Sequence, residues 1–238
     1  MKYVINSQSQ KSVSAVNSKK NLLTIIFLIC LCIPNAFAEI NDIVIDTTIS
    51  PADKLSIIKL YKEGNINISK GNWELAEQKF LRINNITPNI PAIHHSLGLI
   101  YIQTGDTTSA IMYFNKALEK NPKEFKSLYA LGKAHYRKKN HKKAKFYYLE
   151  ALEVPGDKVA VYQNLAGVYY DEENWERALE YLTLARDINP KSPFTLKLMA
   201  YTAMRLERVD VVIDIIMELK KMQHFKLAQQ IEEMLNKI

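Results

Sequence analysis

Few side chains in this sequence are placed where they could catalyse a reaction or hold a metal. His94 and His95 are adjacent, so on a helix their side chains diverge by roughly 100° and cannot share one ligand. Cys30 and Cys32 are the only cysteines, and both lie near the N-terminus. The sequence has no HExxH zinc motif, no glycine-rich phosphate loop and no GxSxG nucleophile turn. We therefore expect no enzyme activity, no metal site and no cofactor.

Binding chemistry is better supported, by tyrosines that alternate with basic side chains. The group consists of Tyr129, Lys133, Tyr136 and Arg137. Their offsets of zero, four, seven and eight place them on one face of a helix. Aromatic rings offer apolar area at low entropic cost, and donors between them can pair with the backbone or acidic groups of an extended peptide. The alternative is that these are ordinary exposed side chains of a helical protein.

The elements that carry these side chains repeat along the chain. Pro91–Pro122 holds two amphipathic runs joined by a Gly105-Asp106 turn, and Pro122 ends the unit because proline has no amide hydrogen to donate. The pattern recurs at a constant interval, without an insertion. The small residue of the second run is, in turn, Ala76, Ala110, Ala144, Ala178 and Val212, and the bulky residue four further on is Phe80, Phe114, Tyr148, Leu182 and Ile216. The small residues allow close helix–helix approach.

This pattern resembles the tetratricopeptide repeat, a helix–turn–helix unit of about 34 residues. The resemblance covers residues 57 to about 222 and implies an all-α fold, a right-handed α-solenoid of helix–turn–helix repeats. Within residues 51–222 we expect five repeats, at 57–90, 91–124, 125–158, 159–192 and 193–222. Ser50-Pro51 is a good helix start, with serine as the N-cap and proline in the first turn, and this helix should run to about Lys70.

In this family the first helix of each repeat lines the inner, concave face. The resemblance therefore implies a set of partner-binding residues on the first helices: Tyr61; His95, Leu99, Ile102 and Gln103; Tyr129, Lys133, Tyr136 and Arg137; Gln163, Tyr170 and Asp171; Lys197 and Tyr201. His135 stands where the family usually has an aromatic residue, and we expect it to be packed or hydrogen bonded. Most of the clamp with which some members bind a chaperone's C-terminal carboxylate is missing, so that function is not implied.

The last repeat departs most from the pattern, and its second helix, at 209–219, is very apolar. Residues 223–238 carry apolar side chains at helical spacing, and we expect a capping helix there, at about 223–237. The competing interpretation is that the apolar fifth repeat is an interface between copies of the chain.

Residues 1–38 have the layout of a secretory signal peptide. Lys19-Lys20 precede an apolar run at 22–33, and Ala36-Phe37-Ala38 is a small–any–small cleavage site. Twelve apolar residues span about 18 Å as a helix, which is short for a membrane span, although an uncleaved signal anchor is the alternative. We expect cleavage near Ala38, export to the periplasm or secretion, and a flexible lead-in at 39–50.

The charge of the chain argues against nucleic acid as a partner. The net charge is +7, but residues 1–38 hold four of the 32 basic residues and no acid, which leaves +3 for the rest. Repeat three is basic and repeat four is acidic, and we expect their turns, Lys138–Lys143 and Asp171–Glu176, to be neighbours that attract one another.

The sequence thus favours a non-catalytic scaffold or adaptor of the cell envelope that holds a segment of another envelope protein in its concave groove. One alternative is a structural homo-oligomer assembled through the fifth repeat. A third class, binding of an anionic polymer, would require the basic side chains of repeat three.

Overall fold

The computed structural model describes residues 49–88 and 90–237. The chain divides into two compact units, the first ending at Lys62 and the second comprising Glu63–Ile238. The predicted signal peptide, its cleavage site at Ala38 and all but the last residues of the lead-in lie outside the described residues. None of the helices in the described ranges is long and apolar enough to cross a membrane.

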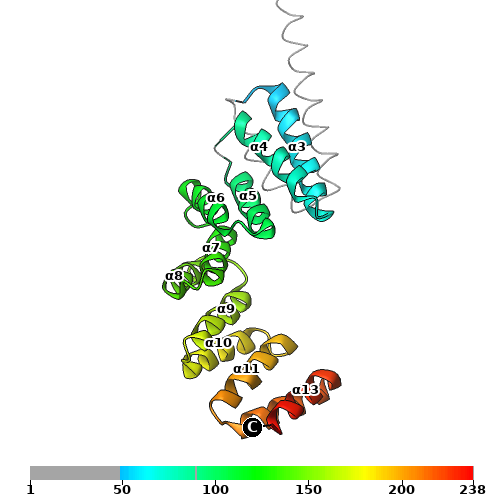
Figure 1. Ribbon diagram of the computed structural model, residues 1–238, viewed down its shortest axis with the longest axis vertical. Helices are drawn as coiled ribbons and strands as arrows, with labels where there is room; N and C mark the ends of the chain where they lie inside the picture. The colour runs from blue at the N-terminus through cyan, green and yellow to red at the C-terminus, as the bar shows by residue number, and fades with distance from the viewer. Residues whose placement is uncertain (1–48, 89, 238) are drawn as a thin grey trace, which may run out of the picture. The chain divides into compact units, whose positions relative to one another are not determined.

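The described residues form eleven α-helices and no strand (Figure 1). They are α3 (Pro51–Ser69), α4 (Trp73–Ile86), α5 (Pro91–Thr104), α6 (Thr107–Lys120), α7 (Phe125–Arg137), α8 (His141–Leu152), α9 (Lys158–Asp171), α10 (Trp175–Ile188), α11 (Pro193–Arg205), α12 (Val209–Lys221) and α13 (Phe225–Leu235). From α4 onward each helix packs against the next one along the chain. The predicted all-α fold of stacked helix pairs is confirmed.

The turn inside each repeat closes in the same way. Once per repeat, at a constant interval along the chain, one residue takes a left-handed backbone conformation, with φ between 56° and 90°; these residues are Gly71, Gly105, Lys139, Glu173 and Glu207. The next residue is the N-cap of the second helix, and Asp106, Asn140 and Asn174 each accept a hydrogen bond from a backbone amide of the first turn. Asn72 before α4 and Arg208 before α12 hold the corresponding positions and provide no such bond.

Each repeat places a small residue of the first helix against a bulky residue of the second. A Cβ atom on Gly98 would lie 2.4 Å from the Phe114 ring, and one on Gly132 would lie 2.4 Å from the Tyr148 ring. In the fourth repeat the same positions hold Ala166 and Leu182, both buried. Glycine therefore occurs where the partner is an aromatic ring, and alanine fits where the partner is aliphatic.

The start of α3 and the helix α13 both agree with the predictions from the sequence. The Ser50 hydroxyl accepts a hydrogen bond from the Asp53 amide at the start of α3, as its N-cap role requires. At the other end α13 packs against α11 and α12, and it buries Ala228 and Ile231. The predicted C-terminal capping helix is therefore present and covers apolar surface of α12.

Candidate functional site

The first helices α5, α7, α9 and α11 are linked to one another by side chains from successive repeats. His95 Nδ1 lies 3.0 Å from Ser127 Oγ, linking α5 to α7. The Tyr136 hydroxyl donates a 2.7 Å hydrogen bond to Asp171, linking α7 to α9. Gln163 Nε2 donates to Thr195 Oγ1 at 2.8 Å, linking α9 to α11. The sequence-predicted residues of the second unit thus lie along consecutive first helices, and we call them, with Gly167, the first-helix face.

The members of the first-helix face differ in exposure. Leu99, Gln103, Lys133, Arg137 and Asp171 are exposed, whereas His95, Ile102, Tyr129, Tyr136, Gln163, Tyr170, Lys197 and Tyr201 are half-buried. Tyr61 is buried, and it belongs to the part of α3 that lies in the N-terminal unit. The charged members of the face and Leu99 are therefore mostly exposed, whereas its tyrosine rings are half-buried.

Tyr129 is held from three sides. Its ring stacks on Phe125 with a centroid separation of 5.8 Å, and the Lys133 ammonium lies 5.5 Å from its centroid. Its hydroxyl accepts a 2.9 Å hydrogen bond from Asn164 Nδ2. Burial raises the pKa of Tyr129 above its ordinary value. A ring fixed in this way can receive a ligand with little further loss of side-chain entropy.

Sequence reasoning missed Asn164, which orders this part of the face. Besides its bond to Tyr129, it donates to the Ala160 carbonyl at 2.7 Å and accepts from the Tyr148 hydroxyl at 3.3 Å. Asn164 follows Tyr129 by 35 residues, the same separation that joins Tyr136 to Asp171, but this separation is recognised only once the helices are packed. Residues at this interval meet across neighbouring first helices.

Tyr136 and Asp171 form the second fixed pair. Burial, and then the hydrogen bond to the Asp171 carboxylate, raise the pKa of Tyr136 to about 12. Arg137, one residue on, reaches the Ile102 carbonyl at 3.4 Å with Nη1, the limit of a hydrogen bond. Most of the guanidinium donors therefore remain available to a ligand.

Basic groups outnumber acidic ones among the charged members of the face. Lys133, Arg137 and Lys197 are basic, and Asp171 is the acidic member. The Lys197 ammonium lies 5.5 Å from the centroid of the Tyr201 ring, the same relation that joins Lys133 to Tyr129. Each cation–ring pair presents a donor beside apolar area.

Gly167 is the member of the face without a side chain. The corresponding residues of the neighbouring repeats are Leu99, Lys133 and Tyr201. A Cβ on Gly167 would have the Tyr136 hydroxyl as its nearest neighbour, at 3.5 Å, which is ordinary contact. Glycine inside a helix costs about 0.5–1 kcal/mol relative to alanine. Packing does not require this glycine, unlike Gly98 and Gly132.

The charged turns of repeats three and four pair with each other. Lys145 Nζ lies 2.6 Å from the Glu172 carboxylate, and His141 Nδ1 lies 3.7 Å from the same group. The Lys145 ammonium also lies 4.8 Å from the Tyr169 ring centroid. Of the predicted basic turn Lys138–Lys143, His141 takes part in this contact, whereas Lys145 lies beyond the turn in α8; both are engaged within the chain.

His94, His95 and His135 are held by contacts within the chain. His94 is buried and its Nε2 lies 2.9 Å from Asn84 Oδ1, whereas His95 points to Ser127. His135 is buried and stacks on Tyr147, with a centroid separation of 5.4 Å and an interplanar angle of 3°. Burial lowers the pKa of both His94 and His135, and nearby lysines lower that of His135 further.

Stacked ring pairs recur at the same place in three repeats. They are Tyr101 with Tyr113, His135 with Tyr147, and Tyr169 with Tyr181, each with a centroid separation of 5.4 Å. His135 thus takes the place of a packed tyrosine. Across the described residues, no three or more histidine, cysteine, aspartate or glutamate side chains gather as a metal site would require.

Comparison with known proteins agrees with this architecture. Residues 89–155 match the family model of the tetratricopeptide repeat. TPR repeat-containing protein PA4299 of Pseudomonas aeruginosa is 33% identical over 106 residues, which is 43% of this chain and 43% of that protein. The chain thus matches less than half the length of this curated relative.

Solved structures share the fold at low identity. The crystal structure of MamA superposes with a TM-score of 0.60 at 19% identity, covering 74% of this chain and 97% of MamA. YrrB superposes with a TM-score of 0.61 at 14% identity, covering 82% of this chain and 97% of YrrB. The described chain therefore has the α-solenoid fold of tetratricopeptide repeat proteins, and the match to the family's own sequence model covers residues 89–155.

Proposed function

We propose that this chain is a non-catalytic interaction scaffold of the cell envelope, and that the first-helix face binds an extended segment of a partner protein. The observation that carries the proposal is the set of tyrosine rings on α7, α9 and α11, of which Tyr129 and Tyr136 are held by hydrogen bonds, together with basic side chains on α7 and α11. The description of YrrB as a tetratricopeptide repeat protein with an unusual peptide-binding site supports peptide binding on this fold.

The partner segment is extended and carries acidic groups. Lys133, Arg137 and Lys197 would pair with its carboxylates, and Tyr170 and Tyr201 would contact its apolar side chains. Gly167 leaves room for its main chain to approach α9 closely. The energetic gain is greatest at rings already held in place, such as Tyr129 and Tyr136, because less side-chain freedom is lost on binding.

The envelope location rests on the N-terminal sequence. A basic start, a short apolar run and the Ala36-Phe37-Ala38 site direct export, with cleavage near Ala38 and release to the periplasm or the medium. Measuring the mass of the chain recovered from the envelope fraction tests this: loss of residues 1–38 is expected, and an intact N-terminus contradicts it.

The binding proposal is tested by a crosslinked pulldown from envelope extract. The variant replaces Tyr129, Lys133, Tyr136 and Arg137 with alanine. A matched control replaces four exposed residues of α8, namely Lys142, Lys143, Phe146 and Leu149. Wild type and control are expected to recover the same partner, and the α7 variant to lose it at equal helicity. Recovery of the same partner by all three chains overturns the proposal.

Gly167→Ala gives the finer test of the same surface. The methyl group meets no steric obstacle within the chain, so the variant should be at least as stable as the wild type. If a partner's main chain approaches α9 here, the variant should recover less partner in the same pulldown. A variant that is destabilised, or that binds as well as the wild type, removes Gly167 from the binding surface.

Self-assembly through the last repeat is the second candidate function. The observation in its favour is that α12 exposes Val209, Ile213 and Met217. Ile216, the bulky residue of the fifth repeat, is 5% exposed and packs in the core, so its substitution cannot report on an interface. Ile213 and Met217 are the residues to change.

A further inference from the structure

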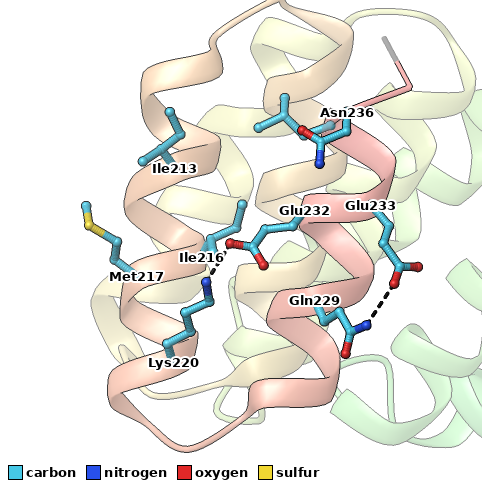
Figure 2. A pocket seen from close by; sticks show the side chains of 9 residues that line it. Ile213, Ile216, Met217, Lys220, Gln229, Glu232, Glu233 and Asn236 are labelled. Carbon is cyan, nitrogen blue, oxygen red and sulfur yellow. Dashed lines mark hydrogen bonds and ion pairs between the residues drawn. The ribbon is translucent and has the colours of Figure 1, made fainter.

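One side of α12 carries an apolar stripe that the described chain leaves uncovered. Val209, Ile213 and Met217 follow one another at intervals of four and are 47%, 46% and 56% exposed. Of the other apolar residues of the helix, Val211 is half-buried and Val212, Ile215, Ile216 and Leu219 are buried. Figure 2 shows Met217 on the side of α12 that faces away from α13 and Ile216 on the side toward it. The capping helix therefore covers one side of α12 only.

Beside the stripe, a depression runs between α12 and α13. Its lining includes Ile213, Ile216 and Met217 of α12 and Leu235 of α13. At its rim Lys220 Nζ lies 2.5 Å from Glu232 Oε1, and Gln229 donates to Glu233 at 2.9 Å (Figure 2). These polar groups are satisfied within the chain, which leaves the apolar floor and the stripe for a partner.

The charged residues beside the stripe are acidic near the start of α12 and basic at its end. Asp210 and Asp214 are exposed in the first half of α12, and Lys221 is exposed at its end. A second α12 that runs antiparallel brings Asp210 of each copy opposite Lys221 of the other, with Ile213 and Met217 of both copies around the two-fold axis between them. A parallel arrangement would instead place like charges together. The stripe is thus complementary to itself in the antiparallel orientation at the two Asp210–Lys221 contacts, which outnumber the single approach of Asp214 to its symmetry copy near the axis.

We propose that α12 pairs antiparallel with α12 of a second copy of this chain to form a two-fold symmetric dimer. The proposal specifies the second candidate function, self-assembly, and is independent of the first-helix face. The contact covers about three turns of one helix, so it is a small interface and its dimer should dissociate on dilution.

The test is sedimentation velocity of the full chain over a range of concentrations. Wild type should shift from monomer to dimer as concentration rises. Asp210→Lys and Lys221→Asp should each weaken the dimer roughly tenfold or more, because each places like charges together at two symmetric contacts. The double variant Asp210→Lys/Lys221→Asp restores opposite charges and should recover dimerisation. Asp187→Lys, on an exposed part of α10, matches the charge change of the first variant and should leave the dimer intact.

Each other outcome overturns the proposal. If the wild-type chain remains monomeric at every concentration, the stripe does not pair with a second copy and would instead bind a different protein. A dimer that survives both Asp210→Lys and Met217→Asp uses another surface. The apolar run at 22–33 is identical in all the variants, so association through it would also survive them. Loss of envelope partners from the first-helix face would not affect any of these measurements.

Discussion

The glycines of the first helices illustrate how single residues set the packing of a repeat. Gly98 lies against the Phe114 ring, which leaves no room for a methyl group. Gly98→Ala should therefore destabilise the chain by about 1–3 kcal/mol, through overpacking of this contact. Ala166 against Leu182 shows that a methyl group is accommodated when the partner is aliphatic.

The double variant Gly98→Ala/Phe114→Leu therefore gives the sharper measurement. Its urea denaturation midpoint should lie well above the value expected from adding the two single losses, because the leucine removes the clash that the alanine creates. Strict additivity of the two substitutions would contradict the packing explanation.

His135 makes stability depend on pH in a defined direction. Burial holds its folded-state pKa below the ordinary value, so the unfolded chain binds the proton more readily as pH falls through about 6.5. Stability should therefore decline from pH 7 toward pH 5. His135→Tyr keeps a stacked ring, as Tyr101 and Tyr169 do in neighbouring repeats, and removes this titration.

Thermal unfolding of wild type and His135→Tyr at pH 7 and pH 5 measures the difference. The variant should lose less stability than wild type over this interval. His94 also has a lowered pKa and remains in both chains, so a residual pH dependence is expected. Identical losses in the two chains would show that His135 does not contribute.

At the scale of the helices and turns, the stability of the chain can be raised at the left-handed residue of each repeat. Lys139 holds φ 56°, a conformation that costs a non-glycine residue about 1 kcal/mol or more. Gly71 and Gly105 hold the same position in earlier repeats. Lys139→Gly should raise the melting temperature, by an amount corresponding to up to about 1 kcal/mol. Gly105→Ala should lower it, and a change of the opposite sign in either variant would contradict the turn's role.

These turns also show why the elements could be predicted from the sequence. Glycine marks the turn at Gly71 and Gly105, but Lys139, Glu173 and Glu207 carry no local signal of a left-handed residue. The constant period of the repeat predicts their positions instead. The caps Asp106, Asn140 and Asn174 recur at the same point of the repeat, so the same period applies to the helix starts.

The side-chain partners on the helices were less predictable. The period gives the face on which a residue lies, but not which residue of the next repeat it meets. Ile216 is buried although it lies in the apolar run that suggested an interface, because its direction on α12 turns it into the core. Asn164 was missed because its role depends on Tyr129, one repeat away.

At the scale of the whole molecule, the chain has two surfaces of different chemistry, the first-helix face and the stripe on α12. The first-helix face is aromatic and basic and repeats with the solenoid. The stripe on α12 is apolar and exposed, because α13 packs against a different side of that helix. A chain with both could hold a partner segment on one surface while pairing with a second copy through the other.

Site-specific photo-crosslinking in living cells tests the central claim, that partners bind the first-helix face. The crosslinking residue would replace Leu99, Lys133 or Tyr201 on that face. The controls replace Met112, Phe146 or Leu184, which are 45%, 56% and 43% exposed on the second helices. The proposal predicts that one and the same partner is captured from the first-helix positions and not from the controls. Capture from the second-helix positions alone, or equally from both sets, would contradict it.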